Sequence, residues 1–210
     1  MTFFSSWLTV FLISLIVVIT PGPDFALTLR SRLAYSRRAG VYTAIGLGCG
    51  NLVHTAYSII GIGAIISRSI VFFHLLKWVG AAYLIYLGIK SVKAKKAVSS
   101  QRTVQRQREI SRWAAFRTGF LGNVLNPKAP PFFFMLFTQV VQPTTPITAQ
   151  VIYGVTVGGV AGIWFILVAL LISQRSIKER ILSFSHWLER LTGAFLIVLG
   201  LRLAVAEQGK

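Results

Sequence analysis

The chain has 210 residues, 54% of them hydrophobic, yet its 22 Lys and Arg against five Asp and Glu give a net charge of +17. The apolar content excludes intrinsic disorder, and the single cysteine, Cys49, excludes a disulfide-stapled secreted domain. A soluble nucleic-acid-binding protein would explain the charge but not the mean hydropathy of +0.68. An integral membrane protein explains both, because its cytoplasmic loops concentrate Lys and Arg.

Stretches with no charge or few charges predict the membrane spans, because an ion in hydrocarbon costs at least ~2.5–3.5 kcal/mol. The exceptions within them are Lys77, Lys128, and Glu189, Arg190 and Arg202 at the ends of the last stretch. These stretches predict an all-α integral membrane protein with six transmembrane helices: 1–23, 39–67, 69–89, two within 118–174 that a turn at 142–146 divides, and 187–206. We expect one transporter domain, with a first three-helix half (1–89), a basic cytoplasmic loop (90–117) and a second three-helix half (118–210). This order suggests a 3+3 repeat, which is inverted in the membrane because three is odd.

Basic residues concentrate on one side of the predicted membrane. Seventeen of the 22 Lys and Arg residues lie in the loops after spans one, three and five. The positive-inside rule places these loops in the cytoplasm and both termini outside. The longest loop, 90–117, is either a docking site for a partner or a topology determinant that rests on anionic membrane lipids. It has no aromatic residue among its cations before Trp113, so we expect no nucleic-acid partner.

A proline motif interrupts the first predicted span. Pro21 and Pro23 remove backbone donors, and Gly22 between them permits a bend. The next residue, Asp24, lies about 9 Å inside the predicted cytoplasmic boundary if the chain is helical there. A carboxylate at this depth is a functional candidate. It is also a favoured cap for a short helix that begins at Phe25.

A second proline motif, residues 123–131, interrupts the fourth predicted span. It contains Asn123, Asn126, Pro127 and Lys128, and its three prolines within five residues do not sustain a helix. Broken helices in a membrane expose backbone groups that are tolerated where they line a cavity. The two breaks lie at similar predicted depth and contribute an acid and a base, and this arrangement is expected of a transporter site. A purely structural ion pair between these two charges is the alternative.

Polar residues in the second and third spans are further candidates. Asn51 and Thr55 lie four residues apart on one face of a helix, with His54 next to them. His54 is either a proton carrier or a hydrogen-bonded packing residue. Lys77 lies inside the third span, where it either lines a polar vestibule or pairs with an unidentified group. Glycines that repeat every four residues predict close helix contacts in the second and fifth spans: Gly46, Gly50, Gly154, Gly158 and Gly162.

Other chemistries lack the residues they require. The three histidines show no metal-binding spacing, and one cysteine cannot complete a thiolate site. The chain has neither a phosphate-binding loop motif nor a nucleophile-elbow motif. We therefore predict no enzymatic activity, no cofactor and no metal site. An ion gradient remains as the energy source, with Asp24 and His54 as the candidate proton carriers.

Several motifs occur together in this chain: 19–24 (Ile-Thr-Pro-Gly-Pro-Asp), 37–40 (Arg-Arg-Ala-Gly), Gly46 and Gly50 with His54, 76–88, and Phe116, Gly119 and Asn123 followed by 126–129. Together they resemble the LysE/RhtB family of amino-acid exporters over nearly the whole chain. The Ala129-Pro130-Pro131 continuation departs from the apolar residues usual there. The resemblance implies a multi-pass protein of the bacterial inner membrane that exports amino acids or close derivatives, driven by the proton-motive force. It does not distinguish among threonine, homoserine, leucine, lysine, arginine and cysteine-type substrates.

These observations lead to a hypothesis for substrate binding between the two breaks. A zwitterionic amino acid would place its ammonium near Asp24 and its carboxylate near Lys128 and a half-helix N-terminus. Asn51, Asn123 and Asn126 would add polar contacts, and proton uptake on Asp24 would release the substrate. The alternative function is a non-transporting membrane scaffold or assembly subunit that acts through the basic loop. The oligomeric state is open, a homo-oligomer included.

Overall fold

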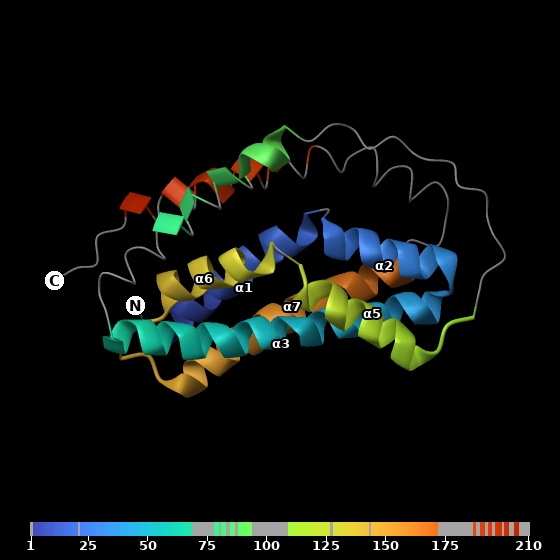
Figure 1. The fold of residues 1–210 in the computed structure, drawn as a ribbon, viewed down its shortest axis with the longest axis horizontal. Helices are drawn as coiled ribbons and strands as arrows, with labels where there is room; N and C mark the ends of the chain where they lie inside the picture. The colour runs from blue at the N-terminus through green and yellow to red at the C-terminus, as the bar shows by residue number, and fades with distance from the viewer. Residues whose placement is uncertain are drawn as a thin grey trace.

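The computed structural model describes residues 2–20, 22–68, 109–126, 128–142 and 144–171, together with short helical stretches between 78 and 93 and between 187 and 205. The described residues form helices and turns without a β-strand, in agreement with the predicted all-α class. In chain order, and labelled as in Figure 1, the helices are α1 (Phe3–Ile19), α2 (Pro23–Ala34), α3 (Arg37–Arg68), α5 (Arg112–Val124), α6 (Ala129–Val140) and α7 (Ile147–Leu171).

α1 and α2 are the two parts of the interrupted first span, and their axes are bent by 56°. α2 begins at Pro23, with Gly22 in the N-cap position. Proline suits the first position of a helix, because the N–H that it lacks has no intrahelical partner there. The predicted break is confirmed. The expectation that Asp24 caps a helix beginning at Phe25 is wrong, because Gly22 is the cap and Asp24 lies within the first turn.

α5 and α6 are likewise the two parts of one interrupted segment. α5 ends at Val124, and α6 begins at Ala129 with Lys128 in the N-cap position. Pro130 and Pro131 occupy the first turn of α6, where their missing N–H groups break no helical hydrogen bond. The second predicted break is therefore confirmed. The prolines predicted at the centres of the two breaks, Pro21 and Pro127, lie outside the described residues.

The two broken pairs run in opposite directions around the long helix α3 (Figure 1). α3 packs along α5 and α7, while α1 packs against α6 and α7, and α2 packs against α3 and α5. Because α1 lies beside α6 and α2 beside α5, both breaks meet in the middle of the bundle.

Glycines allow α3 to approach its neighbours as predicted. A Cβ atom on Gly46 would overlap the carbonyl oxygen of Phe116, and one on Gly119 would overlap that of Thr43. The Thr43 hydroxyl also donates a hydrogen bond of 3.2 Å to the carbonyl oxygen of Ala115. On the other side of α3, a Cβ on Gly154 would overlap the side chain of Thr55. The backbones of α3 and α5 are therefore in direct contact next to the breaks.

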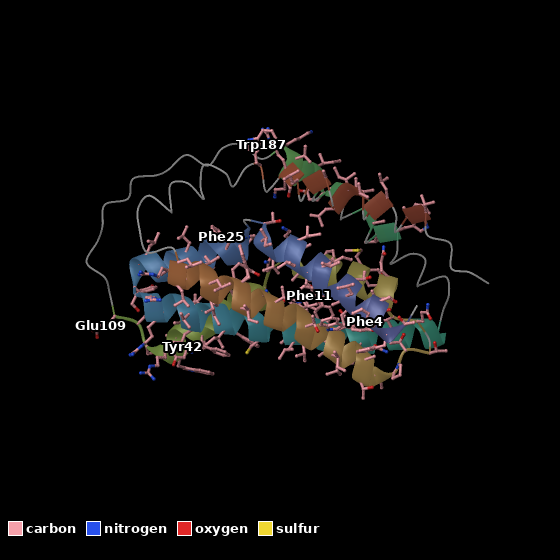
Figure 2. All side chains as sticks on the ribbon, turned by 180° about the vertical axis from the view of Figure 1, so that it is seen from behind. Phe4, Phe11, Phe25, Tyr42, Glu109 and Trp187 are labelled. Atoms are coloured by element: carbon pink, nitrogen blue, oxygen red, sulfur yellow. The ribbon has the colours of Figure 1, made fainter. Side chains whose placement is uncertain are left out.

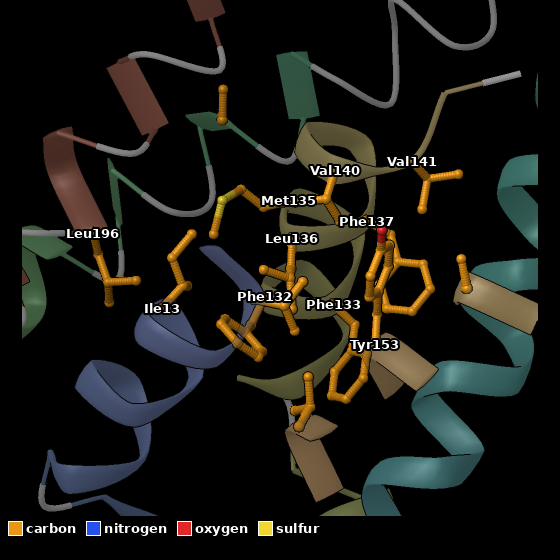
Figure 3. Packing of buried hydrophobic residues seen from close by; sticks show 14 residues of the cluster. Ile13, Phe132, Phe133, Met135, Leu136, Phe137, Val140, Val141, Tyr153 and Leu196 are labelled. Atoms are coloured by element: carbon orange, nitrogen blue, oxygen red, sulfur yellow. The ribbon is translucent and has the colours of Figure 1, made fainter. Parts of the chain in front are cut away.

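An aromatic core packs α6 against α1 and α7. Phe132, Phe133 and Phe137 lie along α6 and share one buried cluster with Tyr153 of α7 (Figure 3). Trp7 of α1 adds a hydrogen bond of 3.0 Å from its Nε1 to the hydroxyl of Thr156 on α7. This core supports the side of the breaks that α6 forms.

The described helices test only part of the predicted number of membrane spans. Among them, α7 with 25 residues is long and apolar enough to cross a membrane alone, and the bent pair α1–α2 meets the same criterion jointly. Spans 69–89 and 187–206 lie mostly outside the described residues, although Gly88 and Gly193 of these segments are in contact. Lys77 and loop residues 94–108 also lie outside them. α5 begins at Arg112, inside the predicted loop, because the Ser111 hydroxyl caps it.

Candidate functional site

Hydrogen bonds to the Asp24 carboxylate join the two helix breaks. Asn123 Nδ2 donates to Asp24 Oδ2 over 2.9 Å, and Asn126 Nδ2 donates to Asp24 Oδ1 over 3.0 Å. Asp24 extends from the first turn of α2, whereas Asn123 belongs to the last turn of α5 and Asn126 to the connection that follows. The structure thus brings together three predicted site residues that are 99 and 102 positions apart.

Asn126 connects the acid of the first break to the base of the second. Its Nδ2 donates to Asp24, and its Oδ1 accepts a hydrogen bond of 3.0 Å from the backbone N–H of Lys128. Both ends of the amide are engaged, so its orientation is determined. The Lys128 ammonium lies near Gly22, where an added Cβ would be 3.9 Å from Nζ, and within attractive range of the Asp24 carboxylate. Acid and base therefore flank the same point between the breaks.

A cavity lies where the breaks meet, with about 560 Å³ of empty space, its open mouth included. The lining contains all five residues predicted to bind substrate: Asp24, Asn51, Asn123, Asn126 and Lys128. Among the described residues of this lining, Asp24 is the single acid and Lys128 the single base.

The Asp24 carboxylate retains acceptor capacity for a ligand. An ionised carboxylate has about four lone-pair positions, and the two asparagines occupy one on each oxygen. Asp24 is partly exposed and lines the cavity. A cationic group in the cavity could therefore bind to Asp24 without displacing the asparagines that orient it.

The start of α6 provides fewer donors than the sequence suggested. Ala129 N–H donates to the Asn126 carbonyl oxygen over 3.1 Å, and Lys128 N–H is bound to the Asn126 side chain. Pro130 and Pro131 have no N–H. The predicted role of a half-helix N-terminus in binding a carboxylate therefore does not apply to the first three residues of α6. Lys128 remains the group predicted to bind an anion at the second break.

His54 lies behind the cavity lining, against Asn123. Its Nε2 is 3.0 Å from the backbone oxygen of Asn123, and its Nδ1 is 2.8 Å from the hydroxyl of Tyr57. A carbonyl oxygen only accepts hydrogen bonds, so His54 Nε2 carries a proton, and in the neutral ring Nδ1 accepts from Tyr57. His54 thereby holds the backbone of the residue that orients Asp24. Its predicted part in proton coupling remains a prediction.

The apolar half of the cavity is absent from the predicted site residues. Phe25, Phe132, Val157, Ala161 and Phe165 line it. Sequence reasoning missed them because an apolar residue in a span can face lipid, the core or a ligand. Val157, Ala161 and Phe165 are spaced four residues apart on α7, which places them on one face of that helix. This spacing was the signal in the sequence that could have found them. In the part of the chain that the structure describes, no group of three or more His, Cys, Asp or Glu is arranged to hold a metal ion.

Comparison with known proteins identifies the family. The model of the LysE type translocators matches residues 15–207. The chain is 29% identical to the membrane protein YrhP of Bacillus subtilis over 92% of this chain and 96% of that protein. It is 35% identical to the homoserine/homoserine lactone efflux protein of Salmonella typhimurium over 73% of each chain. It is 25% identical to the threonine efflux protein of Escherichia coli over 96% of this chain and 98% of that protein. No solved structure matches the chain. Because the family model covers nearly all of the sequence and agrees with the motif resemblance, the chain belongs to the LysE type translocators.

Proposed function

We propose that this translocator exports amino acids from the bacterial cytoplasm, and that the cavity between the two helix breaks is its substrate site. Family membership and the efflux proteins among its relatives support export. One observation carries the location of the site. Among the described residues, a single acid, Asp24, and a single base, Lys128, line one cavity, and these are the two charges that a zwitterion requires.

A bound amino acid would use both charges. Its ammonium would donate to the open lone pairs of Asp24, which Asn123 and Asn126 hold in place. Its carboxylate would accept from the Lys128 ammonium, and α2 retains the N–H groups of Asp24 and Phe25 in its first turn as further donors. Charge-assisted hydrogen bonds of this kind are about twice as strong as neutral ones, so the two ends of the zwitterion would dominate binding.

Proton antiport follows from the position of Asp24 in this scheme. A proton on the carboxylate would remove the charge that holds the ammonium and would favour release. Of the two proton-coupling candidates, we assign this role to Asp24, because it lines the cavity. We assign His54 to holding Asn123, because it contacts the backbone of that residue.

The membrane arrangement belongs to the same proposal. Each half of the chain contains a broken helix pair followed by a long helix, α1–α2 with α3 and α5–α6 with α7. The antiparallel packing of the broken pairs supports a 3+3 inverted repeat with six spans. We propose that the protein lies in the inner membrane with both termini outside, as the seventeen loop cations indicate.

Transport by the purified full chain in liposomes tests the site. Asp24→Asn and Lys128→Met should each lower export about tenfold or more, because each removes a charge-assisted contact worth about 1.5–3 kcal/mol. Asp24→Asn should also abolish the stimulation of export by an imposed proton gradient, which Lys128→Met should retain.

Two exposed residues supply matched controls. Glu109→Gln and Lys90→Met remove charges at exposed positions and should leave export within about twofold of the unmodified protein. Wild-type rates in both Asp24→Asn and Lys128→Met would show that the substrate binds elsewhere. A retained proton response in Asp24→Asn would remove Asp24 from the coupling step alone.

A further inference from the structure

We infer, on the basis of the proposed function, that the exported amino acids have uncharged, apolar side chains, and that Phe132, Val157, Ala161 and Phe165 select them. These four residues are called the apolar wall below. They line the same cavity as Asp24 and Lys128, and α7 contributes three of them from one helical face. The inference rests on what remains in the cavity after the zwitterion has occupied its two charges.

No charge in the described lining is left for a charged side chain. The α-ammonium and α-carboxylate of the substrate require Asp24 and Lys128, which are the lining's one acid and one base. The other acid among the described residues, Glu109, lies at the end of the bundle, away from Phe25, which lines the cavity (Figure 2). A lysine, arginine or glutamate side chain would therefore enter the cavity without a counter-charge.

The apolar wall is backed by packed core on both sides. Ala161 and Phe165 belong to a buried cluster with Phe25 and Leu47, whereas Phe132 and Val157 belong to the aromatic cluster of α6 and α7. Close-packed residues cannot readily move aside to admit water to a buried charge. The wall thus presents a fixed apolar surface, which favours an apolar side chain by about 25 cal/mol per Å² of buried area.

Two of the polar lining residues, Thr20 and Asn51, already bond to the protein backbone. The Thr20 hydroxyl donates to the carbonyl oxygen of Ile16 over 3.1 Å, and Asn51 Nδ2 donates to that of Leu47 over 3.1 Å. A substrate hydroxyl placed against the apolar wall would lose hydration, and the four wall side chains offer it no hydrogen bond. We therefore expect leucine-like substrates to be preferred over threonine, a preference that differs from the named substrates of the efflux relatives.

A panel of labelled amino acids, tested with the full chain in liposomes, discriminates the outcomes. Leucine should exceed threonine in kcat/KM by about tenfold, which corresponds to the additional apolar groups buried. Lysine and glutamate should be on the order of 100-fold poorer than leucine. Lysine or glutamate transport at the leucine rate, or a preference for threonine, would overturn this inference and leave export intact. A panel without any transported amino acid would refute export and this inference with it.

Two opposite changes in the wall test its residues directly. Ala161→Leu fills the cavity and should lower the ratio of phenylalanine to alanine transport about tenfold, whereas Phe165→Leu enlarges it and should raise the ratio of phenylalanine to leucine. Val155→Leu is the matched control on α7, because Val155 is 54% exposed and does not line the cavity. Circular dichroism and size-exclusion profiles establish that the variants fold. Unchanged ratios in a folded variant of either kind would remove the wall from substrate selection.

Discussion

Replacing Gly50 by alanine is the sharpest test of the link between helix packing and the site. Gly50 lies on α3, and none of the hydrogen bonds of the described residues joins it to Asp24. A Cβ at this position would be 2.7 Å from Asn123 Oδ1, 2.9 Å from its Cβ and 3.1 Å from its Cγ. Asn123 is only 2% exposed, and the helix backbones leave little room for it to move. The added methyl group must therefore displace the side chain that orients the Asp24 carboxylate.

The magnitude follows from two separate effects of this displacement. Overpacking a well-packed interior costs about 1–3 kcal/mol of folding stability. Loss of the 2.9 Å hydrogen bond from Asn123 Nδ2 to Asp24 removes a contact to a charged group, worth about 1.5–3 kcal/mol. If that contact acts in substrate binding, kcat/KM should fall about tenfold or more, since about 1.4 kcal/mol corresponds to a factor of ten.

The assay compares Gly50→Ala with Gly61→Ala on the same helix. A Cβ on Gly61 meets nothing within 4 Å, so this control should keep its transport rate and gain up to about 1 kcal/mol from the better helix propensity of alanine. Export in liposomes and thermal unfolding in detergent are measured for both. Wild-type export by Gly50→Ala, or an equal loss in Gly61→Ala, would refute the argument that Asn123 positions Asp24.

Two further substitutions test the elements around the site. His54→Gln retains an amide donor for the backbone oxygen of Asn123 and should keep at least about a third of the export rate. His54→Leu should lower the export rate about fivefold, as expected for the loss of one hydrogen bond. Loss of proton stimulation in His54→Gln would instead identify His54 as a proton carrier. Gly119→Ala should destabilise the fold by about 3 kcal/mol or more in thermal unfolding, because its Cβ would overlap the carbonyl oxygen of Thr43. Gly159→Ala, whose Cβ meets nothing within 4 Å, is the control, and equal melting temperatures for the two would contradict this packing.

The features that could be predicted from the sequence are those that depend on residues close together in the chain. A proline in the interior of a helix interrupts it, because the missing N–H and the ring act on neighbouring residues, so both breaks could be placed in advance. The second span, predicted at 39–67, agrees with α3 over Arg37–Arg68, and the predicted turn at 142–146 falls between α6 and α7. Asp24 and Lys128 were identified as candidates because a charge inside an apolar stretch is costly in any fold.

The tertiary structure decided which of these residues meet. The hydrogen bonds from Asn123 and Asn126 to Asp24 depend on the packing of α2 against α5, which no local pattern specifies. The packing of α3 against α5 places His54 against the backbone of Asn123 and makes Gly50 the residue that leaves room for the Asn123 side chain. The apolar wall was indistinguishable in the sequence from a core or lipid-facing surface, because burial of apolar area has no direction. Only the arrangement of α6 and α7 around the breaks turns these residues toward the cavity.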